Sequence, residues 1–130
     1  MTGRKVLADT CIWIDYFRTS SPTSEELKKL IREEAVVSTG VVLLELLQGI
    51  KKPGDKNVVK DVIMALPFLD ATRESWVLAG EIGFTLRKKG VVIPATDLLV
   101  AAVGKINGCA IFSIDAHFKL IPGLDLYSPS

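Results

Sequence analysis

The stretch from Val6 to Asp9 constrains the fold of this chain more than any other. Val6, Leu7 and Ala8 form a short, wholly apolar run, which is typical of a buried strand. Asp9 ends the run, so a carboxylate stands at the carboxyl end of that strand. Open α/β sheets bind their ligands at this edge. The stretch therefore predicts an α/β fold and also the place of its functional site.

Apolar runs and helical patterns alternate along the rest of the chain. Strands are expected at 35–37 and 109–112, with a weak edge strand at 124–127. Helices are expected over 10–17, 58–66, 72–89 and 94–107, with a turn or short helix at 116–119. Two further helices are expected, one from a cap at Thr23 or Ser24 to residue 31 and one from Ser38 or Thr39 to residue 50. The expected buried face of the helix over 72–89 is Trp76, Ala79, Ile82, Gly83 and Leu86. Short buried strands separated by helices are typical of an α/β fold with a mainly parallel sheet.

Length and charge narrow the class of protein. With 130 residues, the chain is expected to form a single domain, 1–130. Its 16 basic and 15 acidic residues give a net charge of +1, so nucleic-acid binding would depend on local patches.

Cys11 and Cys109 lie in apolar contexts and fit buried thiols of a cytoplasmic protein. No apolar run reaches transmembrane length, so no membrane partner is expected. The mean hydropathy of +0.34 fits a homo-oligomer and a well-filled core equally.

Three later acids occupy settings like that of Asp9. Asp115 follows the strand expected at 109–112, Asp97 lies in the first turn of a buried helix, and Glu45 lies on a helix that follows a strand. Carboxylates crowded at one sheet edge repel each other by several kcal/mol unless protons or cations balance them. The segments that carry these acids offer no matching Arg or Lys, so a divalent cation is expected. Oxygen ligands without His or paired Cys favour Mg²⁺ or Mn²⁺ over Zn²⁺.

Such a site suits phosphodiester hydrolysis. Asp9 and Asp97 are expected to be the principal metal ligands, and Asp115 a direct or water-mediated ligand. Glu45 is expected to bind a second ion or to orient the attacking water, and the Thr10 hydroxyl to fix Asp9.

Each of these residues alone has a simpler structural interpretation. Asp9 suits a helix N-cap, Asp97 a helix start, Asp115 a turn and Glu45 a solvated helix position. His117, the sole histidine, is expected at the surface more than on substrate. The basic runs at 51–52 and 87–89 suit solvated helix ends better than RNA phosphate contacts. Only the combination of the acids predicts a metal site.

The order and spacing of three stretches resemble those of the PIN-domain ribonucleases, in particular the VapC toxins of toxin–antitoxin pairs. The stretches are LADTCIWIDYF, VVLLELLQGI and IPATDLLVAAVGKINGCAIFSIDAHF, and they match best at Asp9-Thr10, Glu45 to Gly49, Thr96-Asp97 and Ser113 to Asp115. The resemblance implies a three-layer α/β/α fold around a central, mainly parallel sheet. It also implies Mg²⁺-dependent endoribonuclease activity, with Mn²⁺ as a substitute, a homodimer and a cognate antitoxin.

One residue departs from the family pattern, and two other functions compete with the nuclease. The family usually has serine after Asp-Thr, where this chain has Cys11, whose thiol is a weaker hydrogen-bonding group. A catalytically weak PIN-like module that binds RNA or an antitoxin is the alternative, and the presence of all four acids argues against it. A phosphotransfer domain of the haloacid-dehalogenase type needs a second Asp at the position of Cys11, and a receiver domain needs a late lysine at a strand end that this chain lacks.

Overall fold

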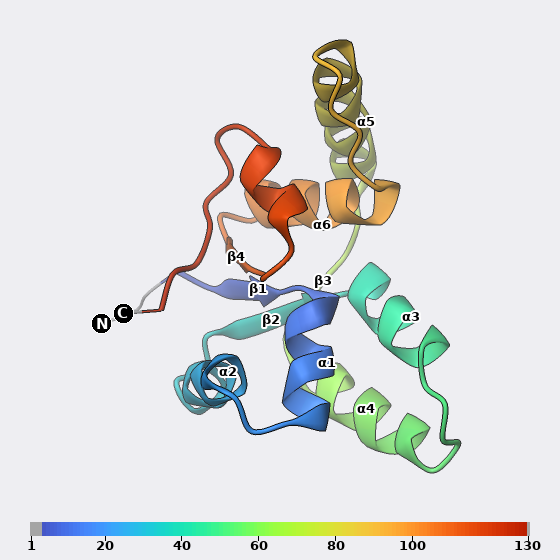
Figure 1. Ribbon diagram of the computed structural model, residues 1–130, viewed down its shortest axis with the longest axis vertical. Helices are drawn as coiled ribbons and strands as arrows, with labels where there is room; N and C mark the ends of the chain where they lie inside the picture. Colours follow the sequence, from blue (N-terminus) through green and yellow to red (C-terminus); the bar gives the residue numbers. More distant parts are fainter. Residues whose placement is uncertain (1–3, 130) are drawn as a thin grey trace.

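A parallel sheet lies at the centre of the protein, whose structure is a computed structural model that describes residues 4–129 (Figure 1). Within these residues the sheet has four strands in the order β3-β2-β1-β4. The strands are β1 (Val6–Ala8), β2 (Val36–Thr39), β3 (Phe68–Leu69) and β4 (Ala110–Phe112). Every residue of β1, β2 and β4 is buried, as expected for parallel strands covered on both faces. The predicted α/β fold with a mainly parallel sheet is confirmed.

Helices cover both faces of this sheet. They are α1 (Thr10–Arg18), α2 (Pro22–Arg32), α3 (Gly40–Gln48), α4 (Asp55–Met64), α5 (Arg73–Lys88), α6 (Ala95–Ile106) and the 3₁₀ helix η1 (Ala116–Leu120). Figure 1 shows α1, α2 and α4 on one side of the sheet and α6 and η1 on the other, with α5 packed on the outside of α6. The three-layer α/β/α arrangement is therefore confirmed. None of the helices within residues 4–129 is long and apolar enough to cross a membrane.

Two strands differ from the prediction. The sequence analysis missed β3, because a two-residue strand after Pro67 is too short to show any alternation. The edge strand expected at 124–127 is reduced to one bridge, between Ile111 and Leu126. Most helix boundaries agree more closely, although α4 begins at Asp55 instead of 58 and α2 also begins earlier than expected, because Ser21 rather than Thr23 or Ser24 caps it. The Ser21 hydroxyl accepts a hydrogen bond from the Ser24 amide at 3.0 Å.

The buried face of α5 is also narrower than predicted. Ala79 and Leu86 are buried as expected, but Trp76 is 59% exposed, so its expected burial is wrong. Helix α5 packs mainly on α6 and therefore buries one stripe, which Ser75, Ala79 and Leu86 occupy at spacings of four and seven. Trp76 follows Ser75 by one position, which turns its side chain by about 100° around the helix.

Helix α6 is buried almost all round, as its apolar sequence predicted, and it lies very close to β4. Every residue from Asp97 to Gly104 is buried. A Cβ atom at Gly104 would lie 2.5 Å from Cδ1 of Ile111, so any side chain there would force Ile111 to shift. The close contact fixes α6, and with it the position of Asp97, against the strand next to β1.

The strand order reverses at β1, between β2 and β4. The chain passes from β1 to β2 on one side of β1 and later returns to β4 on the other side. Such a reversal of strand order is where open α/β sheets bind ligands. Ala8 lies opposite Phe112, and the amide of Asp9 donates to the Phe112 carbonyl at 2.9 Å. The segments that follow β1 and β4 therefore begin side by side.

Candidate metal centre

The four acids come from four different elements, and among them only Asp97 and Asp115 belong, within residues 4–129, to a group whose ligand atoms lie close enough together for one ion. Asp9 follows β1 directly and is only 4% exposed, and Asp97 lies in the first turn of α6 and is 8% exposed. Asp115 precedes η1, and Glu45 lies on α3. Asp9 occupies the N-cap position of α1, yet its side chain makes no capping hydrogen bond. Capping the helix therefore does not account for this buried carboxylate.

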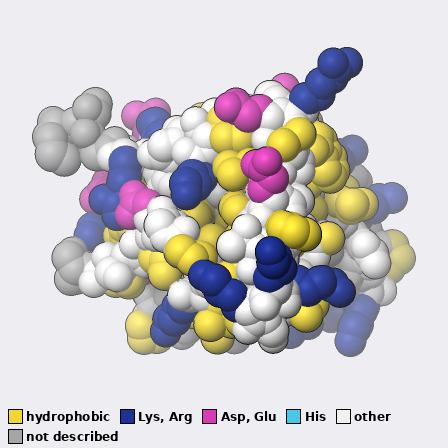
Figure 2. Space-filling view, turned by 90° about the horizontal axis from the view of Figure 1, so that it is seen from above, with side chains coloured by type: hydrophobic (Ala, Val, Ile, Leu, Met, Phe, Trp, Pro, Cys, Tyr) yellow, Lys and Arg dark blue, Asp and Glu magenta, His cyan; other side chains and the backbone are white. Residues whose placement is uncertain are grey.

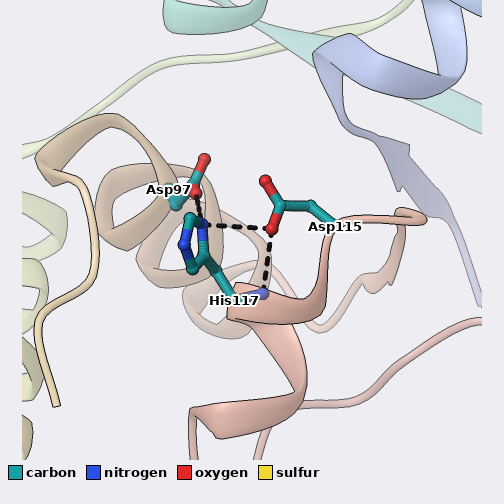
Figure 3. Close-up of side chains that lie close together, drawn as sticks. All are labelled: Asp97, Asp115 and His117. Atoms are coloured by element: carbon teal, nitrogen blue, oxygen red, sulfur yellow. Dashed lines mark hydrogen bonds and ion pairs between the residues drawn. The ribbon is translucent and has the colours of Figure 1, made fainter.

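His117 brings Asp97 and Asp115 together (Figure 3). Its Nδ1 lies 2.9 Å from Oδ2 of Asp97 and 3.0 Å from Oδ1 of Asp115. The ligand atoms of the three residues all lie within 4.8 Å of one another. The sequence analysis expected a surface histidine, and the side chain is indeed 40% exposed, but its ring belongs to the acidic site. The i+2 spacing after Asp115, which caps η1, is the signal that identifies it.

Ser113 links Asp9 to Asp115. Its hydroxyl donates to Oδ2 of Asp9 at 3.1 Å and accepts from the Asp115 amide at 2.9 Å. The Cys11 thiol also contacts Asp9, with Sγ 3.4 Å from Oδ2, and lies 3.3 Å from the Ser113 hydroxyl. The weaker thiol thus still reaches the carboxylate. The sequence analysis gave neither Ser113 nor Cys11 this role.

Thr10 holds a different acid from the one expected. Its hydroxyl donates to Oε1 of Glu45 at 2.6 Å, whereas the sequence analysis expected it to fix Asp9. Thr10 is the first residue of α1, which packs beside α3. The contact ties the carboxylate on α3 to the segment that carries Asp9.

Burial and mutual repulsion disfavour the charged form of Asp9 and of Asp97. Burial raises the pKa of Asp9 and the nearby Glu45 carboxylate adds to the rise, while hydrogen bonds from the Thr10 amide, Cys11 and Ser113 oppose it. Burial likewise raises the pKa of Asp97, with smaller contributions from Asp9 and Asp115, against the hydrogen bond from His117. The hydrogen bond to Asp97 in turn raises the pKa of His117. Repulsion between the carboxylates therefore adds to the effect of burial on both pKa values.

The site fits a divalent cation. Among residues 4–129, no Lys or Arg side chain forms an ion pair with Asp9, Glu45, Asp97 or Asp115. Carboxylate oxygens from several elements are ligands for Mg²⁺ or Mn²⁺. The sequence analysis expected oxygen ligands alone, whereas His117 places a nitrogen close to the oxygens of Asp97 and Asp115.

A cleft lies beside Glu45, between α1, α3 and α4. It has a volume of about 400 Å³, and apolar side chains such as Phe17 and Ile50 line it together with Glu45. Lys51 and Lys52 lie on its wall and are exposed. The cleft therefore joins an apolar surface, positive charge and one acid of the site.

Comparisons with known proteins identify the family and the fold of the chain. The family model described as "PIN domain" matches residues 6–124. A relative named Ribonuclease VapC11, from Mycobacterium tuberculosis, is 29% identical over 121 residues, which cover 89% of this chain and 90% of the relative. The VapBC2 complex of Rickettsia felis, bound to a DNA fragment from its promoter, contains a chain with a TM-score of 0.80 and 23% identity, covering 94% of this chain and 96% of that one. A DNA-bound VapBC from Salmonella typhimurium gives 0.78 and 22%, covering 96% and 98%.

The chain belongs to the PIN-domain family. PIN domains are metal-dependent nucleases, so the enzyme class expected from the sequence is confirmed. The structural similarities are below 25% identity and confirm the fold.

Proposed function

We propose that the protein is a Mg²⁺-dependent endoribonuclease, with Mn²⁺ as a substitute, and the toxin of a type II toxin–antitoxin pair. The observation that carries the proposal is the burial of Asp9 and Asp97, with the ligand atoms of Asp97 and Asp115 close together, and without a Lys or Arg partner for any of the four acids in the described part of the chain. A bound divalent ion would acidify a water molecule and neutralise charge on the scissile phosphate.

Each residue of the site has a separate proposed role. Asp9 and Asp97, the most buried acids, are the principal ligands, and Asp115 is a direct or water-mediated one. Glu45 orients the attacking water or binds a second ion. Thr10 fixes Glu45, and Ser113 fixes Asp9, so both acids keep their orientation before substrate arrives.

The cleft beside Glu45 is the proposed path of the RNA strand. Lys51 and Lys52 supply positive charge for phosphates, which fix a strand without reading its sequence. Phe17 offers an aromatic surface on which a base stacks. Because the net charge of the whole chain is only +1, RNA binding depends on a local patch of positive charge such as this one.

We also propose two protein partners. The named relatives in VapBC complexes support a cognate antitoxin, which would present a basic side chain to the acids in place of the metal. A homodimer is supported by Trp76, Val77 and Phe84, which are 59%, 60% and 66% exposed along one side of α5. Figure 2, seen from the side on which α5 projects in Figure 1, shows hydrophobic side chains exposed among Lys and Arg. An RNA-cleaving toxin acts in the cytoplasm.

The test is cleavage of structured RNA by the purified protein in Mg²⁺ and in EDTA. Asp9→Asn and Asp97→Asn should each lower the cleavage rate by about 1,000-fold or more, because each lost 1.4 kcal/mol of barrier stabilisation costs about tenfold. Asp61→Asn, the same change at an exposed site on α4, should cleave like the wild type. Cleavage that persists in both site variants would contradict the proposal, and binding without cleavage would favour the non-catalytic module.

A further inference from the structure

Nδ1 of His117 faces two carboxylate oxygens at once (Figure 3). It lies 2.9 Å from Oδ2 of Asp97, on α6, and 3.0 Å from Oδ1 of Asp115, which precedes η1. A single proton on Nδ1 can form one straight hydrogen bond, because hydrogen bonds weaken steeply as they bend. A proton therefore serves one of these two oxygens well, whereas a cation between the three atoms would contact all of them.

The spacing of these atoms matches the coordination sphere of a small divalent ion. Ligands at right angles and about 2.1 Å from an octahedral ion lie about 3.0 Å from each other. The two separations from Nδ1, 2.9 and 3.0 Å, equal that value. All three ligand atoms lie within 4.8 Å of one another, so one ion can touch all three.

The surroundings hold the three atoms in place before any ion binds. The His117 amide donates to Oδ1 of Asp115 at 2.9 Å, and the Ser113 hydroxyl accepts from the Asp115 amide. The side chain of Asp97 is only 12% exposed, while the ring of His117 is 40% exposed. Within residues 4–129, Nε2 makes no protein hydrogen bond, so it can carry the ring proton to solvent and leave the Nδ1 lone pair for a metal.

We infer that His117 is a metal ligand, which completes a set of one nitrogen and two oxygens with Asp97 and Asp115. The inference rests on the proposed function and deepens it, because it assigns the ion preference of the same site. Imidazole nitrogen favours transition-metal ions, whereas Mg²⁺ prefers oxygen ligands and retains its water. His117 therefore raises the affinity for Mn²⁺ and Zn²⁺ relative to that for Mg²⁺.

A direct spectroscopic test is available because His117 is the sole histidine of the chain. In the full-length apo protein labelled with ¹⁵N-histidine, Zn²⁺ should shift the Nδ1 resonance much more than the Nε2 resonance. Pulsed electron paramagnetic resonance of the Mn²⁺-loaded protein should show coupling to one imidazole nitrogen. A histidine that only donates a hydrogen bond would give neither signal.

Calorimetric titrations with Mn²⁺ and with Mg²⁺ provide the second measurement. His117→Gln keeps an amide donor for the carboxylates but lacks the imidazole nitrogen. It should weaken Mn²⁺ binding by about 10- to 100-fold and change Mg²⁺ binding by less than about twofold. Lys119→Gln, an exposed change on the same 3₁₀ helix, should leave both affinities unaltered.

The outcomes separate this inference from the proposed function. Equal Mn²⁺ affinities in wild type and His117→Gln, or Zn²⁺ binding without a shift at Nδ1, would overturn the role of His117. If Asp9→Asn and Asp97→Asn still abolish RNA cleavage in that case, the nuclease assignment stands. A wild-type protein that binds none of the three ions would contradict both.

Discussion

The hydroxyl of Thr10 donates a hydrogen bond to Oε1 of Glu45 at 2.6 Å, and so joins the start of α1 to α3. Asp9 receives an equivalent bond from Ser113, and Asp97 contacts His117. Each of these acids is therefore held by a residue from another segment of the chain. Such supporting contacts fix ligands before the metal and substrate arrive, and their loss costs activity more than stability.

Replacing Thr10 tests this support. Thr10→Val keeps the shape of the side chain but removes the donor, so Glu45 loses its fixed orientation. The rate of RNA cleavage should fall by about 10- to 100-fold, while Thr10→Ser should retain most of it. Single-turnover cleavage assays measure both variants. Equal rates in Thr10→Val and wild type would show that Glu45 needs no such positioning.

The apo protein should become more stable as the pH falls from about 8 to about 6. The folded pKa values of Asp9 and Asp97 lie above their ordinary 3.8, so the folded state binds more protons than the unfolded state above 3.8. The raised pKa of His117 acts in the same direction. The stability that protonated His117 contributes is fully present below pH 6.5 and is lost as the pH rises through the pKa of the folded state.

Urea unfolding in EDTA across this pH range measures the trend. With Mn²⁺ present the trend should weaken or reverse, since protons compete with the metal for the same groups. A free energy of unfolding that decreases from pH 8 to pH 6 in EDTA would contradict the electrostatic account of the site.

Local sequence patterns predicted most of the fold because its main elements are long or strongly apolar. The run Val6–Ala8 and the apolar helix α6 were identified correctly, since burial on all sides leaves a clear pattern. Strand β3 has two residues and was missed, because its pairing with β2 depends on a distant segment. Trp76 was misplaced because a helical pattern indicates an apolar face without showing which part of it a neighbouring helix covers.

For the candidate site, the sequence indicated the acids but not the residues that contact them. Asp9 and Asp115 are candidates because each follows a buried strand, but only their combination with Asp97 and Glu45 predicts a metal site. The contacts of Thr10 with Glu45 and of Ser113 with Asp9 span 35 and 104 residues. Side-chain partners at such separations depend on strand order and helix packing, which no local pattern contains.

The approach of α6 to β4 gives a stability prediction. Gly104→Ala should lower the free energy of unfolding by about 1–3 kcal/mol, because its Cβ would lie 2.5 Å from Cδ1 of Ile111. Ile111→Val removes that atom and alone should cost about 0.5–1.5 kcal/mol. The next neighbours, at 3.5 and 3.7 Å, are at ordinary contact distance.

The double variant, with Gly104→Ala and Ile111→Val, should therefore lose about 1 kcal/mol less free energy of unfolding than the two single variants lose together. Chemical denaturation of the wild type, the two single variants and the double variant measures these free energies. Additive effects would mean that the overlap with Ile111 is not what excludes a side chain at Gly104.

The apolar side of α5 gives a prediction about assembly. Light scattering at micromolar concentration should show a dimer, and Phe84→Glu should shift it to monomer because it places a charge in an apolar interface. Met64→Glu, at a residue of α4 that is 58% exposed, is the matched control and should remain dimeric. A wild type that stays monomeric would contradict the homodimer, and a dimeric Phe84→Glu would place the interface elsewhere.

Thermal melts of wild type and Asp97→Asn, in EDTA and in Mn²⁺, test most directly whether the carboxylates form one metal site. In EDTA the variant should melt at or above the wild-type temperature, because a buried like charge is removed. Mn²⁺ at a hundred times its dissociation constant should stabilise the wild type by about 2.7 kcal/mol. Asp97→Asn should lose most of that gain, and an equal Mn²⁺ shift in the two proteins would contradict the account.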